Sequence, residues 1–410
     1  MGLFDNEFIR SNFETLAVSF IIAFLITFIT TPLVGRLAKS LGMIDLPASM
    51  RKQNDSSKSS RINKEPKIKF GGFAIFLGFI GALYFTDNIN GLNLGILLGL
   101  FVILLFGIID DKFDPSGKVT LLGQLIAAFI IVIGGISVTQ ISLYSHSIDL
   151  NWFSAVIDTS ILSYNFIFPA DFMTILWIVG IMNFVNWVGG VDDLNSVVTM
   201  IIATTMAILA LNSNNIAFAT IAIAHVGALN GYIPFNYNPS KIIQGGTGDF
   251  LNGYLLAVFA IIGGTRWSSS FILLALPIID ALLVIFMRFK SHPEIIRNPL
   301  KILTISDKNH LHHRLMDAGY SRKLVLLIES AIMLMISSIA IYFSNIRSDF
   351  RAIIVTITLI FVAFTVVTYL RKRNIRNNAL KVAFNDDEIQ VEATVKVVIE
   401  GEDEDEKFIY

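Results

Sequence analysis

The stretch Leu92-Asn-Leu-Gly-Ile-Leu-Leu-Gly-Leu-Phe-Val-Ile-Leu-Leu-Phe-Gly-Ile-Ile109 carries one polar side chain, and Asp110 and Asp111 follow it directly. A run of about 20 apolar residues is long enough to cross the hydrocarbon core of a bilayer as a helix. The two carboxylates end the run where such a helix would reach water. The pattern therefore predicts a membrane-spanning helix with charged groups at one end.

The composition of the whole chain extends this prediction. The chain has 410 residues, of which 54% are hydrophobic and 15% charged, and its mean hydropathy is +0.67. Because soluble domains carry about 25% charged residues, we expect an all-α polytopic integral membrane protein with no nucleic-acid partner. The absence of cysteine excludes disulfides, thiolate nucleophiles and cysteine-bound metals.

Apolar windows predict about eleven transmembrane helices within a domain of residues 1–371. They lie near residues 16–37, 70–85, 92–109, 121–138, 172–188, 197–211, 216–233, 251–264, 271–287, 324–343 and 353–370. The loops 39–69 and 288–323 each hold about eight Lys and Arg, and more follow the last span. By the positive-inside rule these segments are cytoplasmic, so we expect a plasma-membrane protein with its N-terminus outside and its C-terminus inside.

Two segments are predicted to lie outside the membrane. Residues 47–66 have the polar composition of a flexible insertion. Residues 372–410 form a predicted cytoplasmic tail, whose residues 388–398 alternate polar and apolar side chains as in a strand. Its acidic end, 400–406, is predicted to be solvated and disordered.

Polar clusters gather on the predicted cytoplasmic face. Asp110 and Asp111 could merely end a span, or they could bind a divalent cation or take a proton from a phosphate or hydroxyl. Asn183 and Asn186 are three residues apart and share a helical face, and Asp192 follows them. The asparagines bind a ligand or, alternatively, join two helices by hydrogen bonds.

Two further clusters favour a phosphate-containing substrate. The glycine-rich segment 244–249 follows Lys241 and would expose backbone N–H groups to an anion at a helix start. The stretch Ser306-Asp-Lys-Asn-His-Leu-His-His-Arg-Leu315 holds three imidazoles and a guanidinium. These groups donate hydrogen bonds to phosphate oxygens.

The order of these motifs resembles that of the polyprenyl-phosphate N-acetylhexosamine-1-phosphate transferases, glycosyltransferase family 4. The resemblance covers residues 31–323 and rests on Asp110-Asp111, Asn183 to Leu194, Pro234-Phe-Asn…Pro239-Ser-Lys-Ile242, Pro277-Ile-Ile-Asp280, His310-Leu-His-His-Arg-Leu315, Asp45-Leu-Pro47 and Gly71-Gly72. The His-x-His-His form resembles the undecaprenyl-phosphate N-acetylglucosamine-1-phosphate transferase branch. The phospho-N-acetylmuramoyl-pentapeptide transferases of peptidoglycan synthesis remain an alternative.

The resemblance implies a membrane enzyme with its active site on the cytoplasmic face. It would transfer N-acetylglucosamine-1-phosphate from a UDP-sugar to undecaprenyl phosphate, release UMP and begin the synthesis of a cell-envelope polysaccharide. A magnesium ion, or Mn²⁺ in its place, would neutralise the pyrophosphate. Membrane lipid would surround the protein, and whether it forms a homodimer is left open.

The resemblance also implies roles for individual residues. Asp110 and Asp111 would be catalytic and would deprotonate or position the lipid phosphate. Asn186 and Asp249 are the metal candidates. The substrate-binding candidates are Asn183, Asp192, Lys241, His310, His312, His313 and Arg314.

The chain departs from the family pattern in two places. Gly189 and Asp193 stand where the family has an Asp and a Gly, and Gly246 stands where it has a metal-binding Asp. Asp249, one helical turn after Gly246, could supply the missing carboxylate. Alternatively, the chain has lost efficient catalysis or uses a changed substrate.

A transporter of lipid-linked substrates is an alternative from a different class. It predicts ionisable residues at mid-membrane and paired inverted repeats. The predicted spans have few charges at their centres and show no clear repeat, so we favour an interfacial enzyme.

Overall fold

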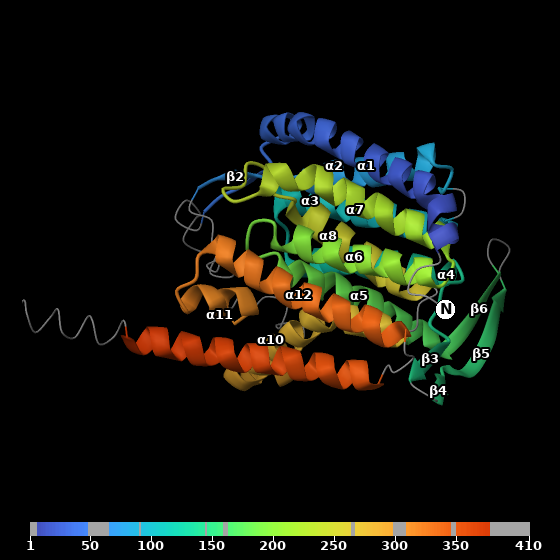
Figure 1. Cartoon of the computed structure of the whole chain (residues 1–410). Helices are drawn as coiled ribbons and strands as arrows, with labels where there is room; N and C mark the ends of the chain where they lie inside the picture. Colours follow the sequence, from blue (N-terminus) through green and yellow to red (C-terminus); the bar gives the residue numbers. More distant parts are fainter. Residues whose placement is uncertain are drawn as a thin grey trace, which may run out of the picture.

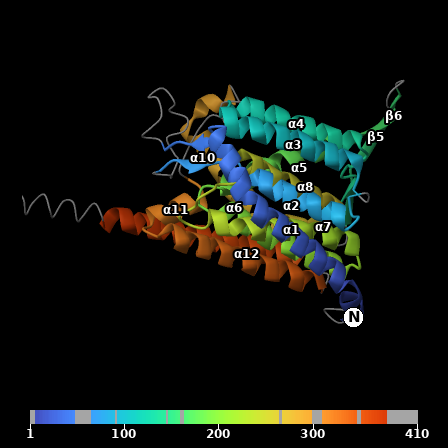
Figure 2. The same ribbon diagram turned by 90° about the horizontal axis from the view of Figure 1, so that it is seen from above.

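A computed structural model describes residues 6–47, 65–89, 92–143, 146–158, 163–263, 267–297, 309–345 and 350–377. Most of the predicted insertion and of the predicted tail lies outside these residues. The described helices lie roughly alongside one another in a bundle (Figure 1, Figure 2). The fold is therefore mostly helical, as predicted.

Eight of the described helices are long and apolar enough to cross a membrane, as expected for a polytopic membrane protein. They are α1 (Asn6–Ser40), α3 (Leu94–Phe113), α5 (Ala170–Val188), α6 (Leu194–Asn212), α7 (Ile216–Asn236), α8 (Gly245–Ile262), α12 (Arg322–Asn345) and a last helix, Phe350–Asn377.

The remaining predicted spans are shorter or broken helices. Helices α2 (Gly71–Phe85) and α4 (Gly117–Ile133) are apolar but have only 15 and 17 residues. The predicted span 271–287 is divided into α9 (Trp267–Leu273) and α10 (Ala275–Ser291). Each predicted span thus coincides with helix over most of its length, but a count of eleven crossings is not confirmed.

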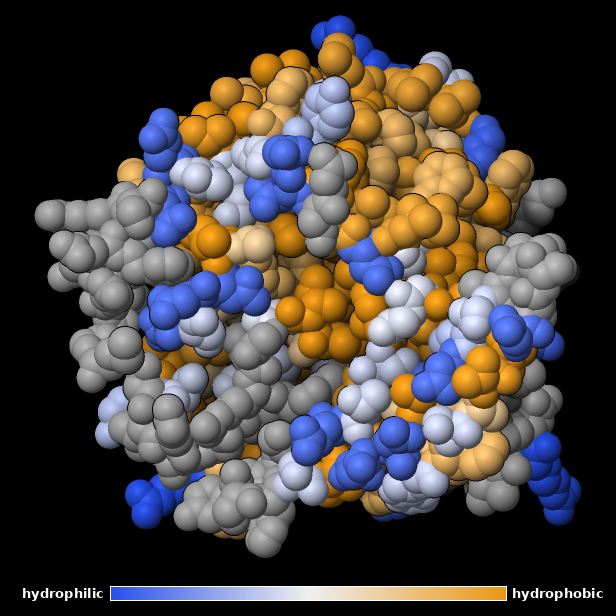
Figure 3. Space-filling model, turned by 90° about the vertical axis from the view of Figure 1, so that its right-hand side faces the viewer, coloured by the Kyte–Doolittle hydropathy of each residue, from blue (hydrophilic) through white to orange (hydrophobic). Residues whose placement is uncertain are grey.

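Besides the helices, the described residues form three two-stranded antiparallel sheets, which the all-α prediction did not include. They pair β1 (Ile44–Asp45) with β2 (Lys67–Ile68), β3 (Gln140–Leu143) with β4 (His146–Asp149), and β5 (Asn151–Asp158) with β6 (Ser163–Pro169). A search for long apolar windows does not detect such short strands. The β3–β4 and β5–β6 hairpins project at one end of the bundle, where hydrophilic and hydrophobic side chains mingle (Figure 1, Figure 3).

Helix α8 lies at the centre of the bundle, and glycines allow its close approach to its neighbours. A Cβ atom at Gly72 in α2 would overlap the backbone of Gly248, and one at Gly107 in α3 would overlap Thr247. Farther along α8, a Cβ atom at Gly253 would overlap the backbone of α5. These contacts bring α2 and α3 to the N-terminal end of α8.

The bundle end opposite the hairpins carries β1, β2, α11 (Leu311–Asp317) and the short 3₁₀ helix Pro293–Ile296. Strand β2 is joined to the loop before α8, because Ile243 N–H donates to the Ile68 carbonyl at 2.8 Å. Gly71 N–H donates in turn to the Ile243 carbonyl at 3.0 Å. Strand β2 and the start of α2 are thereby held against the start of α8.

Candidate functional site

Asp111, at the end of α3, binds the N-terminal turn of α8. Its buried carboxylate accepts hydrogen bonds from Gly246 N–H at 2.8 Å, Thr247 N–H at 3.3 Å and Thr247 Oγ1 at 2.6 Å. An acidic side chain stabilises a helix start by accepting from N–H groups that have no partner within the helix. Asp111 therefore caps α8 and fixes its first turn beside Asp110.

Gly245 and Gly246 lie directly against the acidic pair. A Cβ atom at Gly245 would overlap the Asp111 carboxylate, and one at Gly246 would overlap the Asp110 carboxylate. Gly245 also has φ +69°, which favours glycine. Because residue 246 is a glycine, the Asp110 carboxylate can lie against the start of α8, in space that a side chain at 246 would otherwise fill.

Asp249 is half-buried and points toward the end of α5. A Cβ atom at Gly189 would lie 3.1 Å from Asp249 Oδ1, so the carboxylate occupies space that a side chain at 189 would fill. The Gln244 side-chain amide donates to the same oxygen. The Asp249 carboxylate therefore lies beside position 189, whereas the space beside Gly246 is taken by Asp110. That Asp249 supplies the metal-binding carboxylate stays a prediction.

A buried polar network holds Gln244 in place. Gln244 Oε1 accepts from Ser196 Oγ at 3.0 Å and from Asn252 Nδ2 at 3.3 Å. Asn252 Nδ2 also donates to Asn195 Oδ1 at 2.8 Å, and Asn195 Nδ2 donates to the Val185 carbonyl of α5. Because a buried polar group left unpaired is costly, this network fixes α5, α6 and α8 around Asp249.

The histidine segment is held by Asp280 of α10. His310 Nδ1 lies 2.7 Å from Asp280 Oδ2, and Leu311 N–H donates to Asp280 Oδ1 at 2.9 Å. This carboxylate fixes the first residue of α11 and orients the His310 ring. The His310 and His312 rings are parallel, 5.7 Å apart, and those of His312 and His313 are 4.4 Å apart.

His312 reaches the turn between α5 and α6. Its Nε2 occupies the space beside Gly190 that a Cβ atom would fill. Burial, followed by the neighbouring His313 and His310, keeps the pKa of His312 well below its ordinary value. His312 is therefore a neutral imidazole at pH 7. It lies beside Gly190, and Asp249 lies beside the preceding residue, Gly189.

Asp192 is engaged in an ion pair rather than open to a ligand. Lys67 Nζ lies 2.8 Å from both of its carboxylate oxygens, and Asn238 Nδ2 donates to it at 2.9 Å. Arg322 Nη1 lies 3.7 Å away. Asp192 thus joins β2, the loop after α7 and the start of α12.

Asp193 is a buried carboxylate at the start of α6 with few polar partners among the described residues. It is 1% exposed, has φ 66°, and neither oxygen has a hydrogen bond of normal geometry among the described residues. Burial, followed by the charge of Asp192, raises the pKa of Asp193 from 3.8 to about 7.

Three of the substrate-binding candidates lie apart from this centre. Asn183 Nδ2 donates to Gln124 Oε1 of α4 at 2.7 Å and to the Val179 carbonyl at 2.8 Å. Asn183 thus joins two helices by a hydrogen bond, which was the alternative to ligand binding. Lys241 is exposed. Arg314 points to the last helix, where its Nη1 donates to Thr368 Oγ1 at 3.1 Å. Their substrate roles stay predictions.

Two basic residues at this end of the bundle were not among the candidates. The Arg288 guanidinium is buried and lies 4.9 Å from the centre of the Trp187 ring, which is itself 5.9 Å from the His310 ring. Lys69 is buried, 3.9 Å from Asp45. Two signals in the sequence could have indicated them. Arg288 lies two helical turns after Asp280, and Lys69 follows Lys67 of β2 by two residues.

Oxygen ligands suit a magnesium ion, and the site offers only a few. The described residues contain no group of three metal-ligating carboxylate or imidazole side chains. Magnesium ions at phosphoryl-transfer sites are commonly held by one or two carboxylates together with substrate phosphates. Asp249, packed against the α5 end that carries Asn186, fits that smaller set of ligands.

Comparisons with known proteins agree with this arrangement. The model of glycosyl transferase family 4 matches residues 93–264. A probable undecaprenyl-phosphate N-acetylglucosaminyl 1-phosphate transferase from Bacillus subtilis is 29% identical over 80% of this chain and 83% of its own length. A decaprenyl-phosphate N-acetylglucosaminephosphotransferase from Mycobacterium leprae is 26% identical over 76% and 80% of the two chains.

A phospho-N-acetylmuramoyl-pentapeptide-transferase from Halalkalibacterium halodurans is 27% identical over 60% of this chain and 75% of its own length. Both named branches of the superfamily are thus represented among the relatives. Together with the acidic pair at α8 and the histidines at the α5–α6 turn, these matches show that the chain is a transferase, similar to glycosyl transferase family 4 over residues 93–264.

Proposed function

We propose that this transferase moves N-acetylglucosamine-1-phosphate from a UDP-sugar to undecaprenyl phosphate at the cytoplasmic face of the plasma membrane, releasing UMP. The carrying observation is that Asp110, Asp111, Asp249 and His312 converge at one end of an apolar bundle. A soluble pyrophosphate and a lipid phosphate meet only at such a boundary. The names of the Bacillus and Mycobacterium relatives support this donor sugar and a polyprenyl acceptor.

The residues divide the work by chemistry. A lipid phosphate oxygen attacks the β-phosphorus of the donor, and the bond to the UMP oxygen breaks. Asp110, beside the start of α8, would hold or deprotonate the attacking phosphate. The imidazole N–H groups of His312 and His313 would donate to the pyrophosphate oxygens. When bound by Asp249 and Asn186, Mg²⁺ would neutralise charge on the pyrophosphate.

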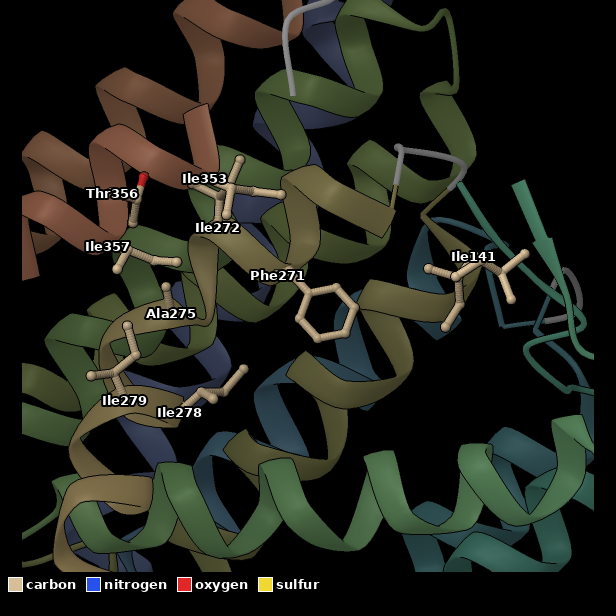
Figure 4. Close-up of a pocket in the computed structure, with 10 residues that line it drawn as sticks. Ile141, Phe271, Ile272, Ala275, Ile278, Ile279, Ile353, Thr356 and Ile357 are labelled. Carbon is tan, nitrogen blue, oxygen red and sulfur yellow. The ribbon is translucent and has the colours of Figure 1, made fainter. Parts of the chain in front are cut away.

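An apolar pocket supports a lipid substrate. Its volume is about 380 Å³, and it lies between α9, α10, the β3–β4 hairpin and the last helix (Figure 4). Its lining includes Ile278 and Ile279, which directly precede Asp280, the residue that holds His310. Part of a polyprenyl chain fits such an apolar surface.

The test is UMP release by the purified protein in lipid, with UDP-N-acetylglucosamine, undecaprenyl phosphate and Mg²⁺, and with Asp110→Asn as the control. We expect release that requires the sugar, the lipid and the metal. Release only with UDP-N-acetylmuramoyl-pentapeptide would move the protein to the peptidoglycan branch. No release from a panel of UDP-sugars would contradict the proposed reaction.

A further inference from the structure

The short helix α11, which carries His312 and His313, is attached to the last helix at several points. Arg314 Nη1 donates to Thr368 Oγ1 at 3.1 Å, and its guanidinium carbon lies 5.8 Å from the centre of the Phe364 ring. Three residues on, Asp317 pairs with Arg371 at 2.8 Å. The Asp317 carbonyl also accepts from Asn374 Nδ2 at 2.9 Å.

These contacts follow one face of the last helix. Phe364, Thr368 and Arg371 are spaced by four and three residues, and Asn374 follows three residues later, so their side chains line one stripe. We call Arg314, Asp317, Thr368, Arg371 and Asn374 the α11 clamp. Its two sides belong to segments more than 50 residues apart in the chain.

The rest of the last helix makes less contact with the bundle. Only 22% of its most apolar window is buried, against 72% for α6, α7 and α8. Some of its residues, such as Ile360 and Val367, join the apolar core, but most of its apolar window is exposed. Its polar contacts with the bundle that the structure describes are made with α11, the element that carries the histidines.

We propose that the last helix positions the histidines of α11 for the sugar donor, through Thr368, Arg371 and Asn374. The inference rests on the proposed function, in which His312 and His313 contact the donor. Arg314 and Asp317 lie one to five residues after these histidines, so a shift of α11 along the last helix moves the imidazoles by the same distance. A displacement of about 1 Å is enough to impair a phosphoryl-transfer geometry.

The expected effect is a loss of donor affinity. A partly exposed ion pair is worth up to about 1 kcal/mol, or about fivefold in an equilibrium constant. Removing Thr368 Oγ1, the Arg371 charge and the Asn374 amide together should raise the KM for the UDP-sugar at least tenfold. The kcat should fall much less, because Asp110, Asp111 and α8 are untouched.

The test compares Thr368→Val/Arg371→Ala/Asn374→Ala with Thr365→Val/Arg373→Ala/Arg376→Ala, a matched set of exposed residues on the same helix. The second readout is hydrogen–deuterium exchange of residues 311–317 in the whole protein, which does not depend on activity. We expect faster exchange and a higher KM in the first set only. Arg371→Ala alone, with 27% of its side chain exposed, serves if the triple variant does not fold.

A charge-reversal experiment distinguishes a positioning role of the ion pair from a general effect of the substitutions on packing. Asp317→Arg with Arg371→Asp reverses the ion pair and should restore part of the KM that either change alone loses. Unchanged KM and unchanged exchange in the clamp variants, with an active wild type, would overturn the inference. If the wild type releases no UMP from any donor, the proposed function fails, and hydrogen exchange still decides whether the last helix orders α11.

Discussion

Replacing Asp193 with Asn should stabilise the protein in a pH-dependent way. The carboxyl is 1% exposed and lacks a hydrogen bond of normal geometry among the described residues, and its pKa is raised from 3.8 to about 7. Between these values the folded protein keeps a proton that the unfolded chain has lost, so stability falls as the pH rises. Above pH 7 the full pKa shift lowers the free energy of unfolding by about 4 kcal/mol.

Asparagine has no charge to bury, so the variant should escape this loss. The variant's advantage over the wild type should be about 2 kcal/mol at pH 5 and about 4 kcal/mol at pH 8, a widening of about 2 to 3 kcal/mol. Asparagine also tolerates the positive φ at this position, but that benefit does not change with pH. The change with pH in the stability difference between variant and wild type therefore reports the cost of burying the Asp193 charge.

The assay is unfolding of the purified protein in mixed micelles at pH 5 and pH 8. Asp192→Asn is the control: the Asp192 carboxylate is paired with Lys67 at 2.8 Å, so its loss should destabilise the protein at pH 8. A stability difference between Asp193→Asn and the wild type that is equal at both pH values would refute the reasoning.

The remaining predictions concern activity. Asp110→Asn should lower kcat by orders of magnitude while the melting temperature stays within a few degrees; full turnover in this variant would exclude Asp110 as base or positioning group. Asp249→Ala should raise the Mg²⁺ concentration needed for half-maximal activity, and an unchanged requirement would place the metal elsewhere. Gly190→Ala should displace His312, whose Nε2 fills that space, and raise the KM for the donor at least tenfold; an unchanged KM would mean that His312 does not contact the sugar donor.

The sequence was informative where a single segment decides the structure. The helical segments follow from apolar length alone, as with α3, whose predicted run 92–109 lies within the helix Leu94–Phe113 except for its first two residues. The ends of the spans are also local features, because Asp110 and Asp111 end an apolar run regardless of how the helices pack. Strands β1 to β4 were missed because they have only two to four residues. Strands β5 and β6 have 8 and 7 residues but were missed because only windows long enough for a membrane span were searched there.

Side-chain directions could not be predicted, because they depend on which helix lies opposite. Asn183 faces Gln124 of α4, and Arg314 faces Thr368, so neither points where its motif implied. The relation between Gly189 and Asp249 is of the same kind. In the sequence they lie 60 residues apart and show no relation, whereas in the structure Gly189 leaves the space that the Asp249 carboxylate fills.

The central claim is that the acidic pair and the histidines transfer a sugar phosphate to a lipid phosphate. Its most direct test supplies UDP-N-acetylglucosamine labelled with ³²P at the β-phosphate, with undecaprenyl phosphate and Mg²⁺, and follows the label into the lipid extract. The account predicts that the label enters the lipid fraction in equal amount to the UMP released, and that Asp110→Asn abolishes both. Label that stays in the aqueous phase while UMP is released would contradict it, because the donor would then be hydrolysed rather than transferred.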